Sequence, residues 1–131
     1  MDERVPRLAR RLRDHDRCGE LELALLFGSW ATGGANAASD IDLALLARAP
    51  LSADFRVGLM RTLGEEFGLP VDLVDLYHAP EPVTGEALRG ARLLGTDEAF
   101  AGLLIRHLDN VEDFVPLQRR MLAERRERWL R

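Results

Sequence analysis

The spacing of apolar residues changes along this chain, and the changes predict the order of its helices and strands. Residues 5–17 carry a valine and two leucines at helical spacing, with arginines on the other faces, which predicts an amphipathic helix. Three apolar runs of strand length follow, and glycine or proline comes soon after each. The predicted strands are Leu21–Phe27, Ile41–Ala47 and Val71–Tyr77.

The segments between and after these strands predict turns and further helices. Ser29–Gly33 is expected to open a short helix before a glycine-rich loop. Ser52 is a favourable N-cap for a helix that ends near Phe67. Two more helices are predicted at Thr84–Arg89 and over about 97–130. One face of the last helix is expected to lie in the core: Phe100, Leu103, Leu104, His107 and Leu108.

These elements predict an α/β (α+β) fold, in which flanking helices cover a small mixed β-sheet. The 131 residues suit a single domain over residues 1–131. Its core is expected over about 20–95, and a C-terminal helical segment over about 97–130.

Composition excludes several classes of protein. No apolar run approaches the roughly 20 residues that a membrane span requires. The N-terminus is polar and rich in arginine, which predicts no secretory signal. A single cysteine, Cys18, excludes an internal disulfide and a cysteine-based zinc site. We therefore expect a cytoplasmic protein without a membrane partner.

Charge is unevenly distributed. All 18 basic residues are arginine, and twelve of them lie in residues 1–17 and 119–131 with only six acidic residues. The intervening segment has six arginines and 16 acidic residues, so it is strongly acidic. An acidic centre favours cations and opposes extended nucleic-acid binding, so no stable nucleic-acid complex is expected.

The first candidate for chemistry is the pair Gly28-Ser29, directly after an apolar strand. If Ser29 opens a helix, backbone N–H groups there are unpaired and suit a phosphate. Glycine allows a close backbone approach, and the serine hydroxyl adds a hydrogen bond. The alternative interpretation of Ser29 is a structural role as a helix N-cap.

The second candidate is an acidic cluster. Asp40 and Asp42 flank Ile41, so they point to the same face of a strand, roughly 6–7 Å apart. Asp72 lies in an apolar strand, where a carboxylate is out of place for packing alone. If the third strand lies beside the second, three carboxylates come together and suit two Mg²⁺ ions. Strand alternation aims Asp75 at the opposite face, so we interpret Asp75 as structural.

The glycine-serine pair together with the aspartates is more specific than either motif alone. The segment FGSWATGGANAASDIDLALL resembles the signature of the nucleotidyltransferase superfamily that includes DNA polymerase beta, and VDLVDL resembles its third-carboxylate strand. The short chain is similar to the minimal (MNT) branch. The segment VDLVDLYHAPEPVTGEALRGARLL, with Asp113-Phe114-Val115-Pro116 after it, is similar to MntA-type antitoxins that are paired with HEPN-domain toxins. The resemblance covers roughly residues 20–118.

The resemblance implies a nucleotidyltransferase fold and a set of roles. Gly28 and Ser29 would hold the triphosphate of ATP; Asp40 and Asp42 would bind two Mg²⁺ ions. Asp72 would ligate the catalytic metal and help to deprotonate the acceptor. Family members of this type transfer AMP from ATP to a tyrosine of the partner toxin, an RNase, and so silence it. Thr32 departs from the family, where a basic residue is frequent, which puts one cationic contact to the triphosphate in doubt.

Two alternatives stay open. The acceptor can be an RNA end or a small, antibiotic-like molecule, although small-molecule enzymes of this kind usually carry a further substrate domain. The chain can also be a catalytically weak antitoxin that neutralises its partner by binding alone. Thr32 favours this second alternative, and the intact Gly28-Ser29 pair and three aspartates oppose it.

Overall fold

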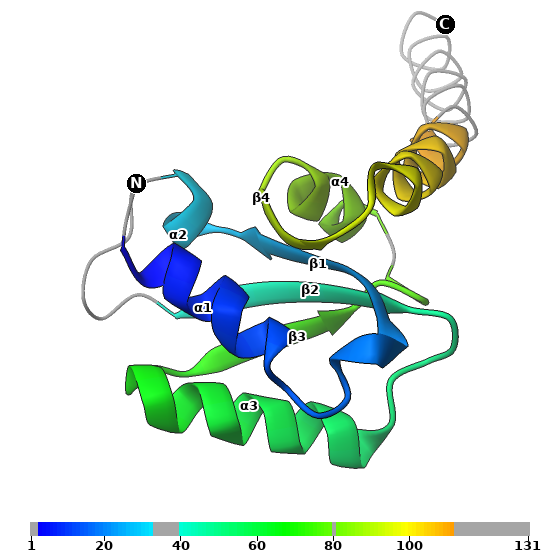
Figure 1. Ribbon diagram of the computed structural model, residues 1–131. Helices are drawn as coiled ribbons and strands as arrows, with labels where there is room; N and C mark the ends of the chain where they lie inside the picture. The colour runs from blue at the N-terminus through cyan, green and yellow to red at the C-terminus, as the bar shows by residue number, and fades with distance from the viewer. Residues whose placement is uncertain (1–2, 33–39, 80, 112–131) are drawn as a thin grey trace, which may run out of the picture.

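The structure is a computed structural model that describes residues 3–32, 40–79 and 81–111 (Figure 1). In chain order its elements are α1 (Arg4–Arg13), the 3-10 helix η1 (Cys18–Glu20), β1 (Leu21–Phe27), α2 (Ser29–Thr32), β2 (Ile41–Ala47), α3 (Ala53–Phe67), β3 (Val71–Asp75), α4 (Val83–Leu88) and β4 (Ala91–Gly95). A last helix is described over residues 97–111 and is called the 97–111 helix below.

The four strands form one mixed sheet in the order β3-β2-β1-β4. β1 pairs antiparallel with β2 and with β4, whereas β2 and β3 are parallel. The parallel pair is joined by α3, the helical crossover that parallel strands require. The mixed sheet with flanking helices confirms the predicted α/β class.

Side chains alternate across the strands and divide the core into two clusters. On one face, Ile41, Leu43 and Leu45 of β2 pack with the buried leucines of α1 and α3. On the other face, Ala44 packs with apolar residues of α4 and the 97–111 helix. Figure 1 shows this arrangement, with α1 and α3 on one side of the sheet and α4 and the 97–111 helix on the other.

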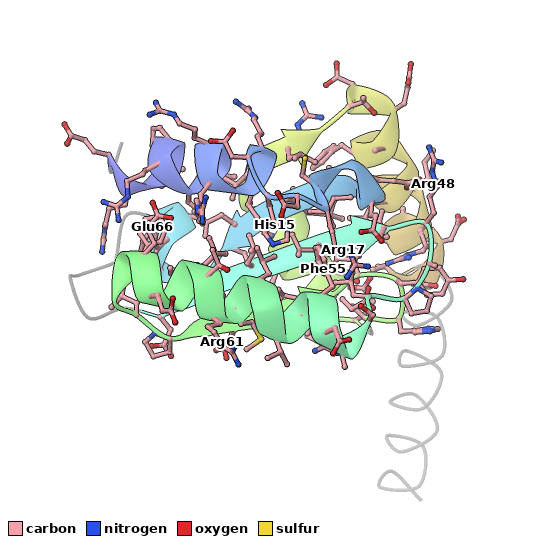
Figure 2. All side chains as sticks on the ribbon, turned by 60° about the horizontal axis from the view of Figure 1, so that its bottom comes forward. His15, Arg17, Arg48, Phe55, Arg61 and Glu66 are labelled. Carbon is pink, nitrogen blue, oxygen red and sulfur yellow. The ribbon has the colours of Figure 1, made fainter. Side chains whose placement is uncertain are left out.

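Ion pairs link the two helices on the first face. Arg7 and Arg11 of α1 approach Glu66 of α3, at N–O distances of 3.6 and 2.9 Å. Figure 2 shows Glu66 on the side of α3 that faces α1. All three side chains are substantially exposed, so these pairs add little stability. Burial of Leu8 and Leu12 on the opposite side of α1 contributes more.

The ends of α3 follow local chemistry. The Ser52 hydroxyl accepts a hydrogen bond from the Phe55 N–H at 3.2 Å, which is the predicted N-cap. Gly68 ends the helix with φ +66°, a conformation that favours glycine, and its N–H donates to the Gly64 carbonyl at 2.8 Å. The chain then enters β3 beside β2.

The structure corrects several sequence predictions. The strand β4 was not predicted, because it is a short edge strand in which only Leu93 is buried. β3 ends at Asp75 rather than Tyr77, and α1 ends at Arg13 rather than Arg17.

The last helix was also predicted only in part. Leu103 is buried as expected, whereas Leu104 and Leu108 are 37% and 51% exposed, so placing them in the core was wrong. The 97–111 helix packs on the sheet along a narrow stripe, so only part of its apolar face is covered. The predicted continuation over 112–130 and the loop over 33–39 lie outside the described residues. No helix within the described part of the chain is long and apolar enough to cross a membrane.

Candidate active site

The sheet brings two of the three predicted carboxylates, Asp42 and Asp72, together at one end. In the register of the strands, Asp42 of β2 lies opposite Phe27 of β1 on one side and opposite Asp72 of β3 on the other. Neighbouring strands are about 4.8 Å apart, so the two aspartates are adjacent on the same face. The condition on which the acidic cluster depended, that the third strand lies beside the second, is therefore confirmed.

Gly28 approaches Asp42 more closely than any other residue type would allow. Its φ is +71°, in the left-handed region. A Cβ atom at Gly28 would lie 2.2 Å from Asp42 Oδ2 and 3.1 Å from Asp42 Cγ. The backbone that leaves β1 therefore lies directly against the central carboxylate of the site.

Ser29 opens α2 immediately after this glycine, as predicted. The next residue, Trp30, is buried, with its ring edge-on to Phe67 at 5.9 Å and Arg4 over its face at 4.1 Å. Trp30 thus anchors α2 to the protein core. Its burial gives Trp30 a packing role.

Asp40 precedes β2 and is exposed. The N–H of Ile41 donates to the Pro70 carbonyl at 3.0 Å, which fixes the start of β2 against the segment that leads into β3. Ile41 is fully buried on the first face, so Asp40 and Asp42 share the opposite face, as strand alternation predicts.

The electrostatics of the site centre on Asp42. Desolvation by burial raises the pKa of the Asp42 carboxyl, and the negative charges of Asp72, Asp40 and Glu86 raise it further. Glu86 belongs to α4. No sequence pattern predicted that Glu86 acts on Asp42, because this depends on how α4 packs on the sheet. Among the described residues, no arginine or histidine forms an ion pair with Asp40, Asp42 or Asp72.

The donor set suits one kind of cation. Within the described ranges, no three histidine, cysteine, aspartate or glutamate side chains converge on a common point as a metal cage would require. Asp42 and Asp72 form a pair instead. Magnesium commonly takes one or two carboxylates and completes its shell with water and substrate phosphates, so this pair fits Mg²⁺ bound together with a nucleotide.

Asp75 has the structural role that its position predicted. Its carboxylate accepts hydrogen bonds from the backbone N–H of Leu51 at 2.9 Å and of Tyr77 at 3.0 Å. It therefore ties the end of β3 to the turn before α3. His78 and Tyr77 next to it are exposed and pack ring to ring at 4.7 Å.

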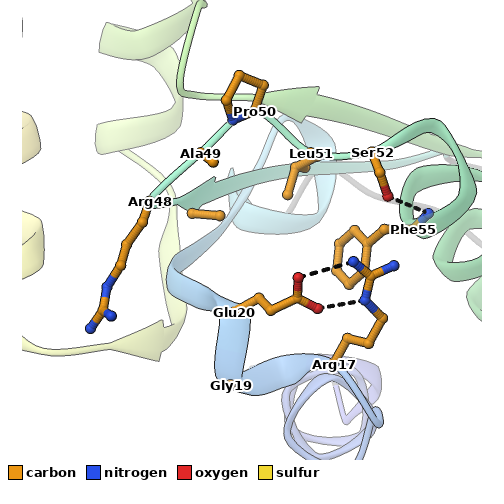
Figure 3. A pocket seen from close by; sticks show the side chains of 10 residues that line it. Arg17, Gly19, Glu20, Arg48, Ala49, Pro50, Leu51, Ser52 and Phe55 are labelled. Carbon is orange, nitrogen blue, oxygen red and sulfur yellow. Dashed lines mark hydrogen bonds and ion pairs between the residues drawn. The ribbon is translucent and has the colours of Figure 1, made fainter.

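A hollow of about 340 Å³ lies at the other end of β2, remote from the carboxylates (Figure 3). There Arg17 forms a two-point ion pair with Glu20, at 2.5 and 2.9 Å, and lies over the ring of Phe55 at 5.1 Å. His15 packs edge-on against the same ring at 5.6 Å; Figure 2 shows these residues together beside α3. These contacts hold η1 against α3 and satisfy one another, so this end has a structural role.

Comparison with known proteins identifies the family. Residues 9–99 match the family described as "Polymerase beta, Nucleotidyltransferase". The chain belongs to this nucleotidyltransferase family. The matched segment contains Gly28, Ser29 and all three aspartates of the site.

A curated relative narrows the similarity within the family. The protein adenylyltransferase MntA of Shewanella oneidensis is 38% identical over 90 residues, which are 66% of this chain and 65% of that protein. The aligned segment thus spans slightly less than two thirds of this relative.

Solved structures resemble nearly the whole chain. A toxin–antitoxin crystal structure with AMP-PNP has a TM-score of 0.76 at 26% identity, and covers 92% of this chain and 96% of the other. A mutant MntA toxin–antitoxin complex has a TM-score of 0.75 at 26% identity, over 95% and 97%. A tri-AMPylated Shewanella oneidensis HEPN toxin in complex with an MNT antitoxin matches with a TM-score of 0.72 at 24% identity, over 95% and 98%, which shows a shared fold.

Proposed function

We propose that this chain is an antitoxin enzyme that transfers AMP from ATP to a tyrosine hydroxyl of a HEPN-domain toxin, and so neutralises the toxin's RNase activity in the cytoplasm. The observation that carries the proposal is the adjacent pair of carboxylates, Asp42 and Asp72, against which the Gly28 backbone is packed. Family membership supports the reaction class. Similarity to a protein adenylyltransferase and to a toxin–antitoxin structure with an ATP analogue supports the donor and the kind of partner.

Each residue of the site has a proposed role. The Gly28 backbone and the Ser29 hydroxyl hold the triphosphate. Asp40, Asp42 and Asp72 would hold two Mg²⁺ ions, which when bound neutralise the charge of the triphosphate and of the leaving group. The raised pKa of Asp42 is consistent with this role, because a bound cation would offset both the desolvation and the carboxylate repulsion that raise it.

The proposed step is an in-line displacement. The acceptor oxygen attacks the α-phosphorus and forms a new O–P bond, while the bond from the α-phosphorus to the bridging oxygen breaks. Pyrophosphate leaves with the electron pair of that bond. The hydroxyl proton passes to the Asp72 carboxylate, which is exposed and therefore accessible to an acceptor.

The test uses purified protein, Mg²⁺, ATP labelled at the α-phosphate and the co-encoded neighbouring protein. We expect label on the partner and a gain of one or more AMP units in its intact mass. Asp42→Asn should abolish the transfer. Asp54→Asn is the matched control, because Asp54 is an exposed carboxylate on α3, on the other side of the sheet, and should leave the transfer unchanged.

Two other outcomes would overturn the proposal. ATP binding that requires Asp42, without transfer to the partner, would indicate a small-molecule acceptor. The absence of both transfer and ATP binding would indicate an antitoxin that acts by binding alone, the function that the Thr32 departure favours.

A further inference from the structure

A cavity of about 620 Å³ adjoins the acidic site, between α4 and the 97–111 helix. Its wall includes Glu86 of α4, and the next residue, Ala87, packs with Ala44, which lies on the same face of β2 as Asp42. Its volume lies within the range of about 300–1,000 Å³ that is typical of small-molecule sites. The roles proposed for Gly28, Ser29 and the aspartates leave this cavity unused.

A paired histidine forms part of the cavity wall. His107 Nδ1 lies 2.8 Å from Glu81 Oε1, and both side chains are about one-fifth exposed. The other carboxylate oxygen of Glu81 accepts a hydrogen bond from the Gly85 N–H at 3.3 Å. Because a carboxylate only accepts hydrogen bonds, Nδ1 carries the proton. In the neutral ring, Nε2 is then a hydrogen-bond acceptor with no partner among the described residues.

The surrounding packing fixes this geometry. A Cβ atom at Gly85 would lie 2.8 Å from His107 Cε1, so the glycine is what lets the ring lie against α4. Leu103, about one helical turn before His107, is buried in the same cluster as Ala87 of α4. Arg106 donates to the Leu76 carbonyl at 2.5 Å and ties the 97–111 helix to the end of β3. The imidazole therefore lies between Glu81 and Gly85, and Leu103 and Arg106 hold the helix that carries it against α4 and the end of β3.

The composition of the wall indicates the kind of ligand. Among the described lining residues, Glu81 and Glu86 outweigh Arg89, so this wall does not suit a phosphate. Pro82 and Val111 supply apolar surface, and His107 and Asn110 supply hydrogen-bonding groups. A flat, neutral heterocycle with polar edges matches this wall.

We propose that this cavity binds the purine base of the donor nucleotide, and that His107, fixed by Glu81, selects adenine over guanine. The proposal rests on the function proposed above and adds where the base binds and which residue selects it. The Nε2 lone pair accepts a hydrogen bond from the 6-amino group of adenine. Guanine carries a carbonyl oxygen at that position, so two acceptors would face each other and one buried polar group would stay unpaired.

The test is equilibrium binding by calorimetry, with Mg²⁺ at pH 8, of ATP, GTP and inorganic tripolyphosphate. An unpaired polar group of this kind corresponds to a preference of about 10- to 100-fold for ATP in the wild type. His107→Ala should weaken ATP binding by a similar factor, reduce the ratio of ATP to GTP affinity toward one, and leave tripolyphosphate binding unchanged. Glu81→Gln preserves the side-chain shape and should lower the same ratio in part, so the proposal stays testable if His107→Ala fails to fold. His78→Ala is the matched control, because His78 is an exposed histidine outside this cavity wall.

The possible failures are distinguishable. If ATP binding depends on Asp42, yet His107→Ala leaves the ATP to GTP ratio unchanged, the base pocket is wrong and the proposed function stands. If His107→Ala leaves nucleotide binding intact but slows transfer at saturating ATP, the cavity holds the acceptor, which also overturns the proposal. If the wild type binds neither ATP nor tripolyphosphate, the proposed function itself fails and this inference fails with it.

Discussion

Replacing Gly28 with alanine tests the close approach between the end of β1 and the central carboxylate. The substitution introduces two separable costs. Gly28 has φ +71°, a conformation that disfavours every residue with a Cβ atom. The new Cβ would also lie 2.2 Å from Asp42 Oδ2, more than 1 Å inside ordinary van der Waals contact.

The magnitudes follow from these two terms. The left-handed conformation costs alanine about 1–2 kcal/mol. Relief of the overlap forces the Asp42 side chain away from its position, at a further cost of about 0.5–1.5 kcal/mol if it leaves its preferred rotamer. We therefore expect Gly28→Ala to lower the free energy of unfolding by about 1.5–3.5 kcal/mol. A carboxylate displaced by about 1 Å should also slow transfer by roughly 100-fold.

The assay combines urea unfolding with the rate of AMP transfer, and Gly68→Ala is the matched control. Gly68 has φ +66°, but a Cβ there would meet nothing within 4 Å. It therefore measures the backbone cost alone and should leave transfer unchanged. In an Asp42→Ala background the clashing oxygen is gone, and the nearest remaining atom, Cβ, lies at 3.4 Å. The extra cost of Gly28→Ala over Gly68→Ala should then disappear.

Equal losses of stability in Gly28→Ala and Gly68→Ala, with an unchanged transfer rate in both, would refute this reasoning. The result would mean that the carboxylate position against Gly28 is not the one used in catalysis. A large loss of stability that persists in the Asp42→Ala background would instead place the clash elsewhere.

Three further predictions use the same measurements. Because the pKa of Asp42 is raised in the folded protein, its charge opposes folding at neutral pH, so Asp42→Asn should unfold at higher urea concentration than the wild type without Mg²⁺. That gain should be complete above the raised pKa and vanish as the pH falls below the ordinary aspartate pKa; a gain that grows toward low pH would contradict the assignment. Asp72→Asn should abolish transfer without unfolding the protein. Asp75→Ala should keep transfer but lower the free energy of unfolding by about 1–3 kcal/mol, because two backbone N–H groups lose their acceptor. The opposite result for the two variants would mean that Asp75, and not Asp72, acts in transfer. Ser52→Ala should lower the free energy of unfolding by about 1 kcal/mol and leave transfer unchanged, which thermal melts and the labelled-ATP assay would check.

The sequence predicted those parts of the fold that depend on local patterns. β1 and β2 begin and end where their apolar runs do: Gly28, with φ +71°, interrupts β1, and a bend at Arg48 and Ala49 leads from β2 to Pro50. β4 escaped prediction because an edge strand with one buried side chain has no apolar run to mark it. β3 ends early because the Asp75 carboxylate turns back to accept backbone hydrogen bonds. The apolar pattern alone did not predict this end, because Leu76 and Tyr77 continue it.

The candidate site was also predicted only in part. Asp42 and Asp72 were predicted to meet only if two strands paired, and the parallel register confirms that they do. Glu86 and the Glu81–His107 pair were not predicted, because each depends on how α4 packs against another element. Sequence spacing identifies residues that share one strand, or two strands of known order. It does not place a helix on the face of a sheet.

None of the described arginines supplies a countercharge to Asp42 or Asp72. The chain has 18 arginines, and described arginines elsewhere pair with Glu20, Glu22, Glu66 and Asp97. None within the described ranges pairs with Asp42 or Asp72, although their repulsion opposes folding. An arginine at this position would stabilise the sheet but would occupy the place of a cation. Without such an arginine the carboxylates are less stable in the folded protein but can bind a cation. A ligand present at 100 times its Kd would stabilise the folded state by about 2.7 kcal/mol.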